Sequence, residues 1–123
     1  MKVLVADDDS DQLSLRCMLL ARSNFETFPA IDAATALDLA AAHKPQCAVI
    51  DLRLPTQARG LQLIQDLKML DPGMHVFVLT GDDAGRLAQV PERPLIDAIL
   101  TKGSASALLL QKLRRVAAEA HPL

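Results

Sequence analysis

The stretch from Cys47 to Pro55, which reads CAVIDLRLP, constrains the fold of this chain more than any other. It opens with a run of four apolar residues, Cys47 to Ile50, and this run ends abruptly on the carboxylate of Asp51. A strand buried on both faces has this pattern, because its side chains are apolar up to the edge of the sheet. Ligands bind outside the carboxyl ends of strands in open parallel sheets, so we expect Asp51 to be the reactive residue. The alternative is that Asp51 only caps a loop.

The composition suits one globular domain. The chain has 123 residues, half of them hydrophobic, and we expect residues 1–123 to form a single domain around one core. The net charge of −2 offers no basic field for nucleic acid or for an anionic membrane, so we expect neither as a direct partner. No apolar run approaches the roughly 20 residues of a membrane-spanning helix, and the first residues do not form a signal peptide. We therefore expect a cytoplasmic protein.

The cysteines and histidines do not indicate a metal site. Cys17 and Cys47 are far apart and form no CxxC pair, so we interpret both as small core residues. The histidines, His43, His75 and His121, share no ligand spacing with them, and we expect solvated or capping roles for all three.

The pattern of an apolar run followed by polar side chains recurs along the chain. Three further predicted strands end in this way: Lys2–Ala6 before Asp7, Asp8 and Asp9, His75–Leu79 before Thr80, and Ile96–Leu100 before Thr101 and Lys102. A weaker strand over Glu26–Ala30 contains Pro29, which cannot donate a hydrogen bond to a neighbouring strand. We therefore place this strand at an edge of the sheet.

The segments between the strands have helical periodicity. We predict helices over Asp11–Arg22, from the Asp32 cap to Ala42, over Leu61–Leu70 and over Ser104–Ala120. Ser10 is expected to cap the first helix, and Pro91 and Pro94 restrict a further helix to a short or distorted one over Ala84–Val90. The residues expected to face inward from the first and last helices are Leu13, Cys17, Leu20, Ala21, Leu109, Leu113 and Val116. Alternating strands and helices predict an α/β fold, a doubly wound five-stranded parallel sheet with right-handed crossovers.

Polar residues at the ends of parallel strands meet at one edge of the sheet. Asp7, Asp8 and Asp51 would bring three carboxylates together, and these need a counter-charge to stay ionised. Mg²⁺ suits this set of oxygen ligands better than zinc does. Lys102 can bind a phosphoryl group, and the Thr80 hydroxyl can donate to another of its oxygens. With Asp51 as nucleophile, the set predicts a site that forms an aspartyl phosphate.

Six segments resemble those of a known family. In order along the chain they are VLVADDD, AIDAATAL, PQCAVIDLRLP, GLQLI, VFVLTG and LTKG. Their order and spacing resemble the receiver domain of response regulators in bacterial two-component systems, of the stand-alone, chemotaxis-regulator kind. The resemblance implies a flavodoxin-like (βα)5 fold with strand order 2-1-3-4-5.

The resemblance also implies roles for the site residues. Asp8, Asp51 and the backbone carbonyl of Arg53 would contact Mg²⁺, and Asp7 would act largely through water. Asp51 would accept a phosphoryl group from a phosphohistidine of a sensor histidine kinase or a histidine phosphotransfer protein. Thr80 and Lys102 would bind the phosphoryl oxygens. The change would alter binding to a downstream protein target, and slow autodephosphorylation would reverse it.

The chain departs from the family at several positions. Gly103 follows Lys102 where the family usually has proline, so we expect a trans bond or a glycine-specific turn there. Ile99 stands where the family usually has Tyr or Phe, so we expect the signal to take a different route. Arg53 and Asp82 are expected to pair across the mouth of the site and to hinder the water that removes the phosphate.

Two other functions compete with the phosphorylated switch. The first is a degenerate receiver that binds a partner protein without phosphorylation. The second is a haloacid-dehalogenase-like phosphatase with Asp7 as nucleophile and Asp9 as acid, although such enzymes carry a substrate cap for which this chain has no room. We expect no output domain after Ala120, so the signal would leave through a protein-binding surface or by onward phosphotransfer. Alternatively, the chain is a piece of a larger kinase or regulator.

Overall fold

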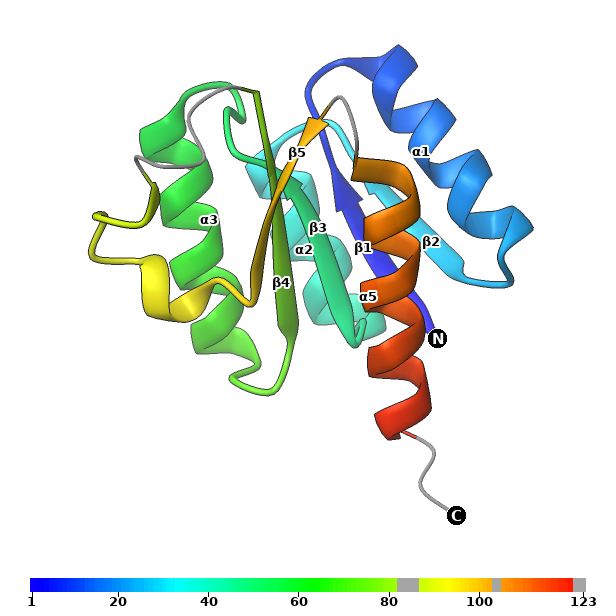
Figure 1. Ribbon diagram of the computed structural model, residues 1–123. Coiled ribbons are helices and arrows are strands. Elements are labelled where there is room, and N and C mark those ends of the chain that lie inside the picture. The colour runs from blue at the N-terminus through cyan, green and yellow to red at the C-terminus, as the bar shows by residue number, and fades with distance from the viewer. Residues whose placement is uncertain (82–86, 103–104, 121–123) are drawn as a thin grey trace.

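The computed structural model describes residues 1–81, 87–102 and 105–120. Its five strands form one parallel sheet in the order β2-β1-β3-β4-β5 (Figure 1). The strands are β1 (Lys2–Ala6), β2 (Glu26–Ala30), β3 (Cys47–Asp51), β4 (His75–Thr80) and β5 (Ala98–Thr101). The predicted doubly wound sheet and its strand order are therefore confirmed, and β2 lies at the edge as Pro29 indicated.

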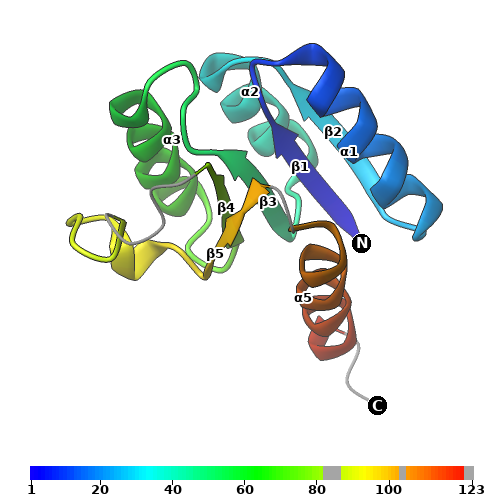
Figure 2. The ribbon, with the colours of Figure 1, turned by 45° about the horizontal axis from the view of Figure 1, so that its top comes forward.

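Helices cover both faces of the sheet. The α-helices of the described residues are α1 (Ser10–Arg22), α2 (Ala33–His43), α3 (Gln57–Leu70) and α5 (Ala105–Ala120), and η1 (Arg93–Leu95) is a single 3-10 turn. Figures 1 and 2 show α1 and α5 on one face and α2 and α3 on the other. No helix in the described ranges is long and apolar enough to span a membrane.

Successive side chains along each strand pack alternately into the two halves of the core, one on each face of the sheet. Val3, Val5 and Val49 face α1 and α5, whereas Leu4 and Ile50 face α2 and α3. Every residue of β3 is buried, which confirms the interpretation of its apolar run as a central strand covered on both faces. The burial of Leu13, Leu20, Leu109, Leu113 and Val116 confirms most of the inward positions expected for the first and last helices.

The helix starts differ from those predicted. The cap of α1 is Asp9 and not Ser10, because the Asp9 carboxylate accepts hydrogen bonds from the backbone N–H groups of residues 11 and 12. Helix α3 begins at Gln57, four residues before the predicted start at Leu61. The Oγ1 atom of Thr56 caps it by accepting from the Arg59 N–H at 3.2 Å. The Asp32 cap of α2 is confirmed, at 2.7 Å from the Thr35 N–H.

Smaller differences concern burial and the last strand. Ala21 is exposed, although the predicted stripe placed it inward, and Cys17 is only partly buried. Strand β5 begins at Ala98 and not at Ile96. The 3-10 turn η1 ends immediately before Ile96, and the backbone N–H of Ile96 donates to the carbonyl of Arg93 in that turn. Residues 84–86 of the helix predicted over Ala84–Val90 lie outside the described residues. In the remainder Leu87 is helical and residues 88–90 form a turn and a bend.

Candidate functional site

The carboxyl ends of four strands bring the predicted site residues together. Asp7 follows β1, Asp51 and Thr80 are the last residues of β3 and β4, and Lys102 follows β5. The sheet register places Asp51 opposite Leu79, one residue before Thr80. Asp7, Asp51 and Thr80 are the polar residues buried in the described part of the chain. Ligands bind at the carboxyl edge of open parallel sheets, so these buried polar side chains mark that edge as the candidate site.

Asp51 lies at the centre of this edge. Its Oδ2 atom accepts a hydrogen bond from Lys102 Nζ at 2.8 Å, and its Oδ1 atom accepts one from the backbone N–H of Arg53 at 3.3 Å. Burial raises the pKa of the Asp51 carboxyl above its ordinary value. The hydrogen bond from Lys102 opposes that rise, and the negative charge of Asp7 adds to it. The side chain of Lys102 is the more exposed member of the pair, at 37% against 8% for Asp51. The ammonium group of Lys102 is therefore accessible to a ligand.

Asp7 is fully buried and both of its oxygens are engaged. Its Oδ1 atom accepts from the Asp9 backbone N–H at 2.9 Å, and its Oδ2 atom accepts from Arg16 Nη1 at 3.0 Å. An enclosed carboxylate with both oxygens bonded does not suit the nucleophile of the phosphatase hypothesis. The Arg16 contact escaped the sequence analysis. Arg16 lies on the Leu13–Leu20 stripe of α1, and a lone cation on an apolar stripe was the available signal.

The three carboxylates fit a hard divalent cation. Asp7, Asp8 and Asp51 each offer one oxygen, and these oxygens lie within 4.8 Å of one another. Mg²⁺ bonds to oxygen at about 2.0–2.1 Å and keeps several waters, so opposite ligands of one ion lie about 4 Å apart. Asp8 is exposed, so it offers an accessible ligand beside the two buried ones.

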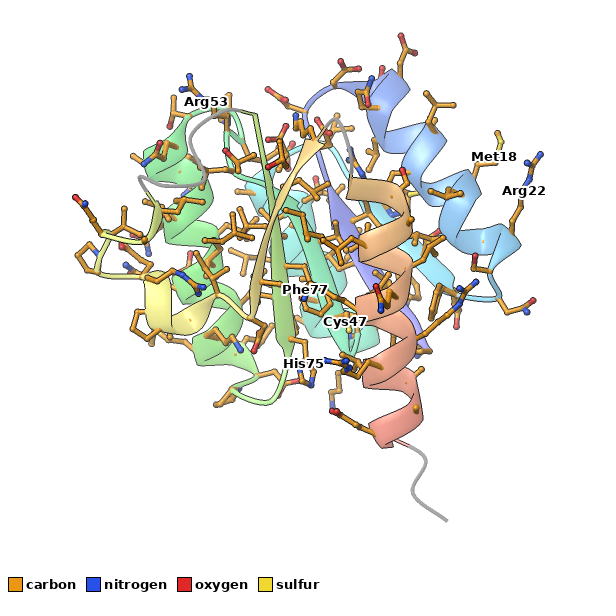
Figure 3. The ribbon with its side chains drawn as sticks, viewed as in Figure 1. Met18, Arg22, Cys47, Arg53, His75 and Phe77 are labelled. Carbon is orange, nitrogen blue, oxygen red and sulfur yellow. The ribbon has the colours of Figure 1, made fainter. Side chains whose placement is uncertain are left out.

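A hollow of about 520 Å³ opens above these groups. Its lining residues are Asp8, Asp9, Asp51, Arg53, Pro55, Thr80, Gly81 and Lys102. Arg53 lies at the end of the molecule where the strands finish, whereas His75 lies at the opposite end (Figure 3). The hollow therefore gathers carboxylates, a hydroxyl and cations around one opening, a combination that binds a phosphoryl group.

Two of the predictions about the site lie outside the described residues. The peptide conformation at Gly103 and the pairing of Arg53 with Asp82 involve residues 103 and 82, which lie outside the described residues. Ile99 is described, and it is a partly buried residue of β5 packed against the α2 and α3 side of the core.

Comparison with known proteins decides the family. Residues 3–114 match the model of the response regulator receiver domain. The chain belongs to the response regulator receiver domains. The transcriptional regulatory protein PrrA of Mycobacterium bovis is 37% identical to it over 79 residues, which cover 64% of this chain and 34% of PrrA. The receiver domain thus matches only about a third of the length of that relative.

Two further relatives match this receiver domain over most of their length. Sporulation initiation phosphotransferase F of Bacillus subtilis is 25% identical over 101 residues, covering 80% of this chain and 77% of that protein. The receiver domain of the Francisella response regulator 1452 superposes with a TM-score of 0.84, covers 98% of each chain and is 24% identical, which shows the shared fold. The resemblance deduced from six short motifs is therefore confirmed.

Proposed function

We propose that this receiver domain is a phosphoryl-accepting switch and that Asp51 is the residue phosphorylated. The observation that carries the proposal is the Asp51 carboxylate itself, buried at the end of β3, bonded to Lys102 at 2.8 Å and open to the hollow. An Oδ atom of Asp51 attacks phosphorus while the bond from phosphorus to the donor's imidazole nitrogen breaks. The freed imidazole takes a proton, and the product is an aspartyl phosphate.

The remaining site residues act on the transferred group. Lys102 is a mobile cation that can move from the carboxylate oxygen to a phosphoryl oxygen, and the Thr80 hydroxyl can donate to another. Asp7, Asp8, Asp51 and the backbone carbonyl of Arg53 are the proposed groups that hold Mg²⁺, with Asp7 acting largely through water. When bound, Mg²⁺ supplies positive charge that offsets the carboxylates and the incoming phosphoryl oxygens.

We propose a sensor histidine kinase or a histidine phosphotransfer protein as the donor and another protein as the target. The name of the Bacillus relative, a phosphotransferase, supports phosphotransfer as the activity. Such donors act inside the cell, so we place the chain in the cytoplasm. Water attacking phosphorus returns Asp51 to its free carboxylate and completes a slow autodephosphorylation.

Intact mass spectrometry after incubation with acetyl phosphate and Mg²⁺ tests the proposal. We expect one added phosphoryl group, lost on treatment with hydroxylamine as an acyl phosphate is, and absent when Mg²⁺ is chelated. Asp51→Asn should abolish the gain, whereas Asp38→Asn, which changes an exposed carboxylate of α2, should leave it intact. If the native chain gains no mass, the degenerate receiver that binds its partner without phosphorylation becomes the better hypothesis.

A further inference from the structure

Helix α1 carries one cation on its inward side. Leu13, Cys17 and Leu20 follow the spacing of an amphipathic helix, and Arg16 lies on the same stripe. Its side chain is only 13% exposed. By contrast, Arg22 and Met18 point away from the sheet on the same helix (Figure 3). A largely buried arginine needs a partner, because burial of an unpaired charge is strongly unfavourable.

That partner is a carboxylate of the proposed metal site. Arg16 Nη1 lies 3.0 Å from Oδ2 of Asp7, whose side chain has no exposed surface. Lys102 is bonded in the same way to Asp51. Two of the three carboxylates thus have a side-chain cation bonded to them already, and Asp8 is the exposed one.

We propose that Arg16 is an internal counter-ion that shares Asp7 with the divalent cation and lowers the affinity of the site for it. The inference rests on the proposed function, since it concerns the metal of that site. A guanidinium bonded to Asp7 neutralises part of the charge that attracts the ion, and it repels a second cation at close range. Arg16 also offsets the buried charge of Asp7 when no metal is bound, because a buried carboxylate without a partner is unfavourable.

The matched variants are Arg16→Gln, Arg16→Lys and Arg22→Gln. Isothermal titration of each folded chain with Mg²⁺ measures affinity without any phosphorylation. We expect Arg16→Gln to lower the Kd for Mg²⁺ by roughly tenfold, because it removes one positive charge beside the ion. Arg16→Lys keeps the charge and should stay within roughly threefold of the native chain. Arg22→Gln removes the same charge from an exposed position on α1, so it should leave the Kd unchanged.

A second measurement needs no variant and so does not depend on the folding of Arg16→Gln. In the native chain, the side-chain ¹⁵N resonance of Arg16 should shift as Mg²⁺ is added and saturate with the same Kd, while that of Arg22 stays in place. A static Arg16 resonance during saturable Mg²⁺ binding would overturn the inference. So would an Arg16→Gln chain that binds Mg²⁺ with equal or lower affinity, which would make Arg16 a positioning residue for Asp7.

The experiment also separates this inference from the proposed function. Saturable Mg²⁺ binding that Asp8→Asn weakens, with no change in Arg16→Gln, removes the counter-ion and leaves the metal site standing. Absence of Mg²⁺ binding in both the native chain and Arg16→Gln removes the metal site and the inference together. Binding by Arg16→Gln alone would be the strongest support for competition.

Discussion

A substitution at Gly60 tests how closely α3 is packed against the segment that carries Asp51, the proposed acceptor. A Cβ atom added at Gly60 would lie 1.8 Å from the carbonyl oxygen of Leu52, the residue directly after Asp51. Real Cβ atoms do not approach other heavy atoms within 3.0 Å, so Gly60→Ala requires a shift of about 1.2 Å in the backbone of α3 or of residues 51–53. Because the obstructing atom belongs to the backbone, no side-chain rotation relieves the contact.

We expect Gly60→Ala to lower the free energy of unfolding by about 2–3 kcal/mol, the upper part of the usual range of about 1–3 kcal/mol for overpacking a filled interior, because the obstructing atom belongs to the backbone. For a domain of this size the Tm should fall by roughly 10 °C. Urea unfolding followed by circular dichroism measures the first quantity and calorimetry the second. The same displacement moves the neighbours of Asp51, so phosphorylation by acetyl phosphate should also slow at temperatures where the variant is fully folded.

Gly73→Ala is the matched control. Its new Cβ would lie 3.4 Å from the nearest atom, which is ordinary contact, and Gly73 has no positive φ. This variant should be neutral or more stable by about 0.5 kcal/mol, because alanine restricts the unfolded chain. If Gly60→Ala proved as stable as Gly73→Ala, the close approach of α3 to Leu52 would be wrong.

Three further outcomes follow from the titrating groups. Burial raises the folded pKa of Asp51 above 3.8, so ionisation of this carboxyl costs stability as the pH rises through that higher value. Asp51→Asn should therefore be more stable than the native chain at pH 7 without metal and equal to it below pH 3.8. The midpoints of urea unfolding measure both differences. Burial raises the pKa of the Cys47 thiol to about 12, so Cys47 should resist a thiol reagent at pH 8 until the chain unfolds, and rapid labelling of the folded Cys17→Ser chain would contradict this. The hydrogen bond from the Thr35 N–H lowers the pKa of Asp32. The stabilisation of α2 by this cap is therefore complete above pH 3.8 and is lost as the pH falls through the lower folded pKa. Asp32→Ala should reduce the midpoint of urea unfolding at pH 7, and Asp32→Asn should retain most of that midpoint.

The strands were the most predictable part of the fold. Four of the five are apolar runs with a polar end, and burial between two layers of helices favours that local pattern whatever the rest of the chain does. Asp51, Thr80 and Lys102 could be placed together before the structure was known, because all parallel strands present their carboxyl ends at one edge. The cap of the first helix was predicted wrongly as Ser10. Asp9 and Ser10 can both cap a helix, and only the backbone path shows that Asp9 does so.

The start of α3 was missed for a similar reason. The predicted start at Leu61 left residues 57–60 in the loop after Asp51, although only glycine at position 60 disfavours the interior of a helix. In the structure Pro55 precedes the cap, and Gly60 lies inside the helix because it must clear the Leu52 carbonyl. Glycine is needed at position 60 because the Leu52 carbonyl, which lies outside the helix, leaves no room for a side chain. Local helix propensity does not include such a tertiary contact, so it could not predict this glycine.

The sequence by itself determined the alternation of strands and helices, the family and the carboxylates at the strand ends. The alternation and the carboxylates follow from periodicity and composition within short windows, where the physical cause acts between neighbours in the chain. The family follows from the resemblance of six short segments, which the comparison confirmed. Only the tertiary structure showed that Arg16 bonds to Asp7, that Lys102 bonds to Asp51 and that Gly60 lies against Leu52. Those pairs form because the order of strands in the sheet, and the face on which each helix packs, bring separate segments within a few ångströms of one another.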